Sequence, residues 1–445
     1  MRKLCLWWRI AATVGLVAVL SFIGPAYAAS QKITIMVKDK DDIGRWQEAV
    51  ERASQLDPAL KDFTVVYETP PDVNVAFFAE FGANDAPDIV SIDSFEVPAW
   101  AEAKYLYDIT DLVEAWDGWA QYPTPLQEIV KHQGRVYALL KQTDVRIIFL
   151  RKDLLPYALG CQWQPLSWEE LLSMARRLKA AGMEYPLAIQ SGPNWGESTT
   201  MQAFLPLLYG AGGILYDQEK GKWVVSSNAY LDVLNFYKTV YEEGLANPDV
   251  PTVASPWMTA RGDFQAGRTA ILFDGQWAWG AFKSGGSLEV PNANCNVGFI
   301  KIPGKNGGFV TFSGGFAWAI ANKGLDIPPA HPKEAFELIA AYCSQEGIAK
   351  HAVETNSVAP RLDAVKVPEY AQNKYLSWCT TEVLPYTHYR PALPEYPQVS
   401  EQIRLLVKQV ATLQMTPEEA LAEYAKAVAE IVGSDNVIDE LGLLK

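Results

Sequence analysis

Histidine and cysteine, which often serve as metal ligands and nucleophiles, are scarce in this chain. The 445 residues include four histidines, which lie far apart without ligand spacing: His132, His331, His351 and His388. We therefore predict a structural or solvent-exposed role for each histidine, and no metal site. The five cysteines contain no C-x-x-C pair, so the usual zinc and thioredoxin-like motifs are unsupported.

The sequence motifs of common enzyme classes are also absent. There is no G-x-S-x-G elbow, no G-x-x-x-x-G-K-[ST] phosphate loop, no G-x-G-x-x-G and no H-E-x-x-H. Carboxylates are too frequent for any pair to indicate glycoside hydrolysis, which requires a spatial separation that sequence does not show. We predict that the protein uses no cofactor and is not an enzyme, with a secreted carbohydrate-active enzyme as the alternative.

Excess positive charge is missing as well. The formal net charge is -14 at pH 7, and three of the cations, Arg2, Lys3 and Arg9, belong to an N-terminal segment that we expect to be removed. Because nucleic acid and anionic membranes bind clustered lysine and arginine, this charge disfavours both as partners.

The N-terminus has the features of a secretory signal peptide. An apolar run over residues 10–23 follows the cations, and Ala26-Tyr27-Ala28 supplies a cleavage site. A membrane anchor is the alternative, but the run is shorter than the ~20 residues that span a bilayer. We predict that residues 1–28 are cleaved and that the mature chain, from Ala29, is periplasmic or extracellular. No cysteine stands near the cleavage point, so we expect no lipid anchor.

Four cysteines remain in the mature chain: Cys161, Cys295, Cys343 and Cys379. An oxidising compartment would allow one or two disulfides, and four cysteines permit three full pairings. Buried free thiols are the alternative, because a chain of this length has a core of its own. The sequence leaves the disulfide state open.

Alternating strand and helix patterns predict an α/β fold. Hydrophobic residues make up 49% of the chain and charged residues 20%, which is typical of globular domains. Strand patterns at residues 32–37, 63–68 and 88–93 alternate with helical patterns at 45–56 and 74–81. This β-α-β-α-β order is typical of a parallel sheet with helices on its faces.

Two later helices have clear start and stop signals. Capping-box patterns at residues 167–170 and 416–419 predict helix starts, and Gly182 and Gly433 predict the ends. The length suggests two or three domains, yet no Pro/Gly/Ser linker divides the chain. We therefore expect domains that exchange the chain more than once.

Aromatic residues are abundant, with 15 Trp, 20 Tyr and 17 Phe. Aromatic faces beside polar side chains suit a sugar, which has apolar C–H faces and a rim of hydroxyls. "FDGQWAWG", residues 273–280, places two tryptophans directly behind a predicted strand.

Six segments, in order along the chain, resemble the family 1 extracellular solute-binding proteins, the maltose-binding-like receptors of ABC sugar importers. The segments are "NVAFFAEFGANDAPDIVSIDS", "KQTDVRIIFLRKDLL" with "PLSWEELLSMARRLKAAG", "FLPLLYGAGGILYD", "FQAGRTAILFDGQWAWG", "SGGFAWAI" and "TPEEALAEYAKAV". The resemblance covers essentially the whole mature chain. It implies two α/β lobes of the type II periplasmic-binding-protein fold, with a ligand cleft at the hinge between them.

The resemblance also implies how the chain is divided. After the signal peptide at 1–28, residues 29–144 and 314–358 would form lobe 1. Residues 145–313 and the helical C-terminal part, 359–445, would form lobe 2.

Ligand contacts carried over from the family fall on ten residues: Asp42, Asp93, Asp144, Trp195, Trp277, Gly314, Gly315, Phe316, Arg390 and Tyr396. Trp277 would stack on a sugar ring, whereas Trp279 would pack inward. Gly314 and Gly315 would let the backbone approach the ligand, and Phe316 would line the cleft.

Structural roles compete with several of these assignments. Asp93 is also suited to a helix N-cap and Asp144 to a salt bridge with Arg146. Asp42 lies in the charged run "KDKDD", which favours a solvated charge. Surface or packing roles are the alternatives for Trp195, Arg390 and Tyr396.

The expected function is capture of a sugar, a di- or oligosaccharide, by a monomeric receptor that hands it to the permease subunits of an ABC transporter. The alternative within the binding class is a receptor for another polar solute, such as a glycerol phosphodiester or a polyamine. A phosphate ligand would require cations or helix N-termini in the cleft, and a polyamine would require more carboxylates.

Overall fold

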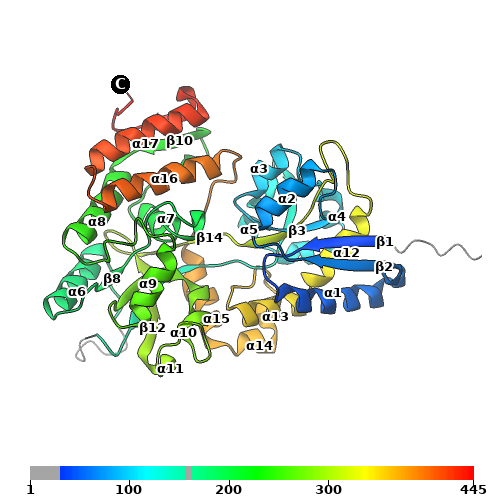
Figure 1. Cartoon of the computed structure of the whole chain (residues 1–445), viewed down its shortest axis with the longest axis horizontal. Helices are drawn as coiled ribbons and strands as arrows, with labels where there is room; N and C mark the ends of the chain where they lie inside the picture. The colour runs from blue at the N-terminus through cyan, green and yellow to red at the C-terminus, as the bar shows by residue number, and fades with distance from the viewer. Residues whose placement is uncertain (1–30, 156–162, 445) are drawn as a thin grey trace, which may run out of the picture.

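Two lobes, each built on its own sheet, form the computed structural model, which describes residues 31–155 and 163–444 (Figure 1). The predicted signal peptide, Cys5 and Cys161 lie outside the described residues. Within the described ranges, no helix has the length and apolar character needed to cross a membrane. Cys295 is exposed and Cys343 and Cys379 are buried, and all three are free thiols.

Lobe 1 is the part of the chain around a five-stranded sheet of order β2-β1-β3-β15-β6. Its strands are β1 (Gln31–Met36), β2 (Phe63–Glu68), β3 (Ile89–Asp93), β6 (Ala138–Leu140) and β15 (Phe316–Ile320). β1 pairs in parallel with β2 and β3, which confirms the β-α-β-α-β prediction, whereas β15 is antiparallel to β3 and β6. A short hairpin, β4 (Lys131–His132) with β5 (Arg135–Val136), completes the strands of this lobe.

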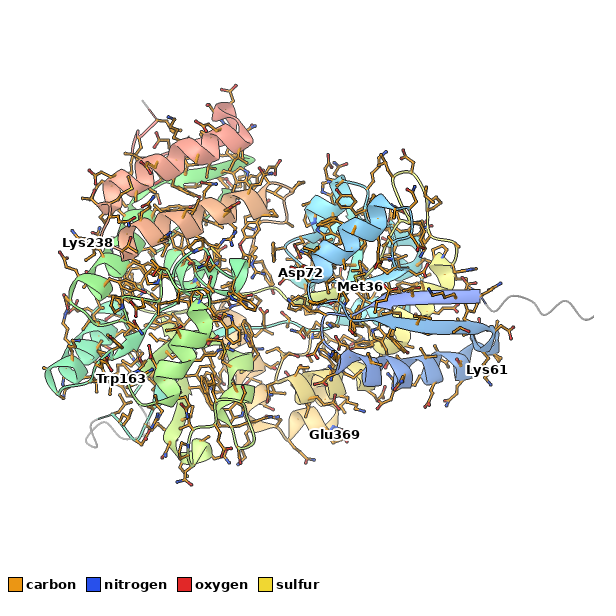
Figure 2. All side chains as sticks on the ribbon, in the orientation of Figure 1. Met36, Lys61, Asp72, Trp163, Lys238 and Glu369 are labelled. Carbon is orange, nitrogen blue, oxygen red and sulfur yellow. The ribbon has the colours of Figure 1, made fainter. Side chains whose placement is uncertain are left out.

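The helices of lobe 1 come from two separate segments of the chain, one before β6 and one after β15. They are α1 (Asp42–Leu56), α2 (Val73–Gly82), α3 (Val97–Glu102), α4 (Thr110–Glu114), α5 (Thr124–Glu128), α12 (Pro332–Tyr342) and α13 (Gln345–Thr355). Figure 2 shows Met36, at the carboxyl end of β1, on the side of lobe 2, and Lys61 at the opposite end of lobe 1. Residues that follow β1 and β3 therefore reach the space between the lobes.

Lobe 2 is the part of the chain around a four-stranded sheet of order β12-β7-β11-β8. Its strands are β7 (Arg146–Arg151), β8 (Leu187–Ala188), β11 (Ile271–Gly275) and β12 (Val297–Ile300). Two smaller sheets lie beside it: β13 (Ile302–Pro303), β14 (Phe309–Ser313) and β16 (Thr387–Tyr389), and β9 (Tyr216–Asp217), β10 (Lys222–Ser226) and β17 (Val437–Asp439).

The helices of lobe 2 include two long C-terminal ones that pack on each other (Figure 1). They are α6 (Trp168–Ala180), α7 (Met201–Gly210), α8 (Asn228–Glu242), α9 (Pro256–Gln265), α10 (Trp279–Phe282), α11 (Ala293–Asn296), α16 (Tyr396–Ala411) and α17 (Pro417–Val432). Two short helices, α14 (Pro368–Ala371) and α15 (Lys374–Trp378), follow α13 along the lower edge of the molecule in Figure 1.

The two predicted capping boxes have different outcomes. At α17, Thr416 and Glu419 satisfy each other's backbone N–H groups, so this box is confirmed. At α6, Ser167 accepts from the Glu170 N–H at 3.3 Å, but the Glu170 carboxylate accepts from Leu166 at 2.8 Å and not from Ser167. Only half of that box forms, because the Glu170 carboxylate bonds the N–H of the residue before the N-cap, Ser167.

Strand β7 lies between two hydrophobic cores. Ile147 and Phe149 join the core cluster that extends from lobe 1, while Ile148 and Leu150 join the cluster under α8 and α16. Successive side chains of a strand point to opposite faces, so β7 contributes to both cores. The continuous apolar run in its sequence reflects this burial on both sides.

Three segments cross between the lobes and are bonded to one another. The first joins β6 to β7, the second joins β14 to β15 through Gly314 and Gly315, and the third follows α13. Thr143 exchanges backbone hydrogen bonds with Val358 at 2.8 and 3.0 Å, and its hydroxyl donates to the Gly314 carbonyl at 2.9 Å. The crossings therefore form one bonded hinge.

Candidate functional site

A cavity of about 780 Å³ lies between the lobes and takes side chains from both. Seven of the ten residues predicted as ligand contacts line it: Asp42, Asp93, Asp144, Trp195, Trp277, Phe316 and Arg390. Gly314, Gly315 and Tyr396 are not among its lining residues.

Trp277 reaches the cavity from the turn that follows β11. A Cβ atom on Gly275 would lie 2.1 Å from the Trp277 ring, so the glycine makes room for the indole. The Gln276 side chain accepts from the Val145 N–H at 2.9 Å, which ties this turn to the first crossing. Trp279 packs inward, as predicted, with its ring 5.9 Å from that of Tyr375.

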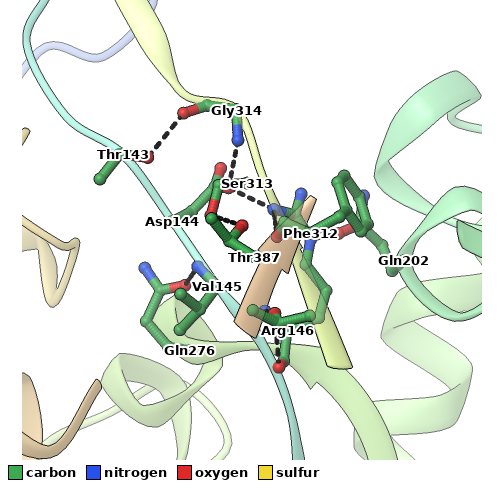
Figure 3. A network of polar contacts seen from close by, with 12 residues as sticks. Thr143, Asp144, Val145, Arg146, Gln202, Gln276, Phe312, Ser313, Gly314 and Thr387 are labelled. Carbon is green, nitrogen blue, oxygen red and sulfur yellow. Dashed lines mark hydrogen bonds and ion pairs between the residues drawn. The ribbon is translucent and has the colours of Figure 1, made fainter. Parts of the chain in front are cut away.

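Asp144 and Arg146 form the ion pair that the sequence suggested, within a buried network (Figure 3). The Arg146 guanidinium also donates to Gln202 at 2.7 Å and lies 5.0 Å from the Trp277 ring centroid. Asp144 accepts from the Gly314 N–H at 2.9 Å. The network therefore holds a cavity carboxylate and one face of Trp277 in place at the hinge.

Arg390 joins carboxylates of the two lobes. It lies 3.6 Å from Asp93, at the end of β3, and 3.0 Å from Glu197, in lobe 2. Asp93 does not cap α3, since Glu96 occupies that position without a side-chain hydrogen bond. Burial raises the pKa of Asp93 against the opposing effect of Arg390.

Tyr396 supports Glu197 from behind the cavity. Its side chain is fully buried, and its hydroxyl donates to the Glu197 carboxylate at 3.0 Å. The Ser400 hydroxyl donates to the same carboxylate. The structure thus places Tyr396 behind a lining residue, because helix α16 directs it into the core of lobe 2.

Asp42 is buried, so its interpretation as a solvated charge is wrong. The carboxylate is 2.5 Å from Lys141, 3.0 Å from Arg45 and 2.7 Å from the Tyr342 hydroxyl. Burial is the largest single effect and disfavours the ionised carboxylate, but Lys141 and the other polar groups around it together outweigh burial and hold the pKa of Asp42 well below its usual range. His351 lies 3.7 Å away, and burial lowers its pKa, so it remains neutral.

Gly314 and Gly315 make room for protein groups. A Cβ atom on Gly314 would lie 2.4 Å from Arg390, and one on Gly315 would lie 2.0 Å from the Gln142 carbonyl oxygen. Gly315 also has φ +140°, which side chains rarely adopt. These glycines allow two crossings and Arg390 to pack together, rather than lining the cavity as the family resemblance implied.

Sequence reasoning did not select several lining residues as contacts: Lys38, Arg45, Lys141, Gln142, Glu197, Gln202, Trp257, Arg261 and His351. Glu197 could have been found, because it follows Trp195 by two residues in the loop already selected. No sequence pattern near Lys141 indicated a role at the site, because its ion-pair partner, Asp42, lies 99 residues earlier.

The cavity combines four aromatic rings with carboxylates, amides and guanidinium groups from both lobes. Within the described residues, no group of three or more His, Cys, Asp or Glu side chains could hold a metal ion. Such a lining can bind the apolar faces and the hydroxyls of a polar ligand together.

The carboxyl group of Glu96, beside Asp93, is expected to make the stability of the protein depend on pH. Burial, followed by repulsion from Asp93, raises the pKa of Glu96 from 4.5 to about 7. The folded chain therefore binds more protons than the unfolded chain between these values, and its stability falls as pH rises through that window. We expect Glu96→Gln to raise the melting temperature relative to wild type more at pH 8 than at pH 5.

Thermal melts of both proteins at the two pH values check this prediction. Glu401→Gln, which removes an exposed carboxylate on α16, controls for the change in net charge. An equal difference at pH 5 and pH 8 would contradict the raised pKa.

Comparison with known proteins gives consistent matches. The family model of bacterial extracellular solute-binding proteins matches residues 44–349. A probable sugar-binding periplasmic protein of Brucella melitensis is 26% identical over 312 residues, covering 66% of this chain and 68% of that protein. A mannitol-binding protein of Pseudomonas aeruginosa is 23% identical over 368 residues, covering 77% of this chain and 79% of that protein.

Solved structures match over most of the chain. The GacH receptor of Streptomyces glaucescens, studied unliganded and with acarbose, has a TM-score of 0.76 at 22% identity and covers 91% of this chain and 98% of its own. Maltose-bound MalE3 of T. maritima has a TM-score of 0.74 at 23% identity, and the match covers 90% of this chain and 100% of that chain. At these identities the likeness establishes the fold.

Proposed function

Since the chain belongs to the bacterial extracellular solute-binding proteins, we propose that it captures a di- or oligosaccharide and delivers it to the permease subunits of an ABC importer. Proteins of this family are receptors and not enzymes. The observation that carries the sugar assignment is the cavity lining, where Trp195, Trp257, Trp277 and Phe316 lie among hydrogen-bonding charged groups. Aromatic faces fit the C–H faces of sugar rings, and ionised side chains bond strongly to hydroxyls.

Capture works by hinge closure, in which the lobes move together around the ligand. We propose the boundaries 29–144 with 314–358 for lobe 1, and 145–313 with 359–445 for lobe 2. The two separate main sheets and the three bonded crossings support this division. Helices α14 and α15 contribute Tyr370 and Tyr375 to the core cluster that also contains lobe 1 residues, so the last boundary is the least sharp.

The receptor acts in the periplasm or outside the cell, like the rest of its family. We propose that cleavage after residue 28 releases a monomer without a lipid anchor. Mass spectrometry of the exported protein should find Ala29 at its N-terminus, and light scattering should give the mass of one chain.

A ligand screen tests the function. The mature protein should show a raised melting temperature with one class among mono-, di- and oligosaccharides, because a ligand that binds only the folded state stabilises it. Glycerol phosphates and polyamines belong in the same screen. A shift with these solutes alone would overturn the carbohydrate assignment, and release of reducing sugar from glycosides would favour the enzyme alternative.

Trp277→Ala tests the predicted stacking contact. We expect the mutation to weaken sugar binding by ~1–3 kcal/mol, because a stacking indole supplies contact area at the site. Titration calorimetry with the sugar found in the screen measures the change. Trp279→Phe retains an inward-packing ring and should leave affinity close to wild type. Unchanged affinity in a folded Trp277→Ala protein would remove this residue from the site.

A further inference from the structure

A chain of polar side chains runs from the interior of lobe 1 to the wall of the cavity. The Tyr342 hydroxyl lies 2.7 Å from Oδ1 of Asp42 and 3.1 Å from Nδ1 of His351. On the other side of the ring, Nε2 of His351 lies 2.7 Å from Oε1 of the Gln142 amide. Gln142 is half-buried and lines the cavity, and its second amide atom has no hydrogen-bond partner among the described residues.

The contact with Asp42 fixes the proton of the Tyr342 hydroxyl. Lys141 at 2.5 Å and Arg45 at 3.0 Å hold the Asp42 carboxylate ionised, so this group can only accept. A phenol oxygen 2.7 Å from the carboxylate must therefore donate its one proton to it. That oxygen has no proton left for His351, so the 3.1 Å contact is a hydrogen bond only if Nδ1 carries a proton and donates it.

His351 carries no second proton. Burial, followed by repulsion from Lys141, lowers the pKa of the ring, and these effects outweigh the attraction of Asp42 at 3.7 Å. The ring is therefore neutral at pH 7, with its proton on Nδ1 and a lone pair on Nε2. Charged and titratable groups face or flank it from every side: Asp42 and Arg45 on α1, Lys141 after β6, Tyr342 on α12, and Glu354 one turn along α13, which binds Arg45 at 2.8 Å.

This proton arrangement decides which end of the Gln142 amide meets the ring. An amide oxygen at Nε2 of His351 would place two acceptors 2.7 Å apart with no hydrogen between them. A half turn of the amide exchanges its oxygen and its nitrogen without changing the shape of the side chain. The NH2 group then donates to the ring, and the carbonyl oxygen faces the cavity as an acceptor.

We propose that Gln142 is a specificity-determining residue, whose carbonyl oxygen accepts a hydrogen bond from a ligand hydroxyl. Tyr342 and His351 are positioning residues that hold the amide in this orientation, although Tyr342 does not line the cavity. The inference rests on the proposed function and deepens it. The group bound here must donate a proton, so a sugar with a methyl ether at this position binds more weakly than one with a free hydroxyl.

Nitrogen-15 NMR of the full mature protein at pH 7 tests the proton positions without a ligand, because it distinguishes a protonated ring nitrogen from a bare one. His351 should be neutral with its proton on Nδ1, and His351→Gln assigns its signals among those of the four histidines. An imidazolium ring, or a proton on Nε2, would overturn the proposal. The amide oxygen could then accept from the ring, and the NH2 group would face the ligand.

Tyr342→Phe tests the positioning role. It removes the acceptor of the Nδ1 proton, and Asp42 at 3.7 Å is beyond hydrogen-bond distance. We expect the proton to move to Nε2, the amide to turn, and affinity for maltose or mannobiose in calorimetry to fall about 10-fold. Tyr122→Phe is the matched control, because it also removes a buried hydroxyl of lobe 1, bonded to the Leu140 carbonyl at 3.0 Å. It should change neither the tautomer nor the affinity.

Gln142→Met separates the contact from its support. This variant should lose a similar part of the affinity, and adding Tyr342→Phe to it should cause no further loss, because both changes act on one hydrogen bond. Additive losses, or wild-type affinity in Gln142→Met, would overturn the role of Gln142 and leave the receptor function intact. If wild type binds no saccharide, the proposed function fails as well, and the tautomer of His351 shows separately whether the amide is oriented as inferred.

Discussion

Replacing Arg390 by methionine should lower the free energy of unfolding by about 3–5 kcal/mol, because removing one partner of a buried ion pair leaves the others charged and unpaired. Arg390 is 7% exposed, and it is the counter-ion of Asp93 in lobe 1 and of Glu197 in lobe 2. Its guanidinium also lies 5.2 Å from the Phe95 ring centroid and 5.0 Å from that of Phe312. Sugar affinity should fall too, because both carboxylates line the cavity.

Urea denaturation at pH 7 measures the change in stability. A triple variant that adds Asp93→Asn and Glu197→Gln should recover part of the loss, since neutral amides need no counter-ion. Arg135→Met, which breaks exposed ion pairs with Asp108 and Asp111, is the matched control and should change stability little. If Arg390→Met is as stable as the control, the ion pairs of Arg390 do not contribute to the stability of the fold.

Features of the fold that depend on neighbouring residues were predictable from the sequence. The first three strands and two helices appear where their patterns indicated, although α1 begins at Asp42, three residues before the predicted range. The Thr416 box forms as its spacing requires. Periodicity and capping act over a few residues, so a single sequence contains them.

Site features that depend on distant residues were not predictable in the same way. The charged residues around Asp42 predict a solvated side chain, but Lys141 and Tyr342, from distant segments of the chain, bury its carboxylate. Trp277 was accessible to sequence reasoning, because the glycine that makes room for it lies two residues earlier. Tyr396 was predicted to contact the ligand, yet the sequence could not show that its hydroxyl bonds Glu197, which lines the cavity in its place.

Gly315→Ala should destabilise the protein by about 3 kcal/mol or more and weaken sugar binding, because two unfavourable effects coincide at this residue. Its φ of +140° strains any side chain, and the new Cβ would lie 2.0 Å from the Gln142 carbonyl oxygen. That carbonyl belongs to the first crossing, so the second crossing would be pushed away from it. The Thr143 bond to Gly314 and the Gly314 bond to Asp144 would then lengthen or break.

Gly307→Ala separates the two effects, because Gly307 has φ +125° but nothing within 4 Å of an added Cβ. Urea denaturation and sugar titration of both variants give the comparison. Gly307→Ala should lose only the stability that the backbone angle costs and should bind sugar like wild type. The additional loss in Gly315→Ala then measures the contact between the crossings. If both variants lose the same stability and retain affinity, close packing of the crossings is not what couples the hinge to the cavity.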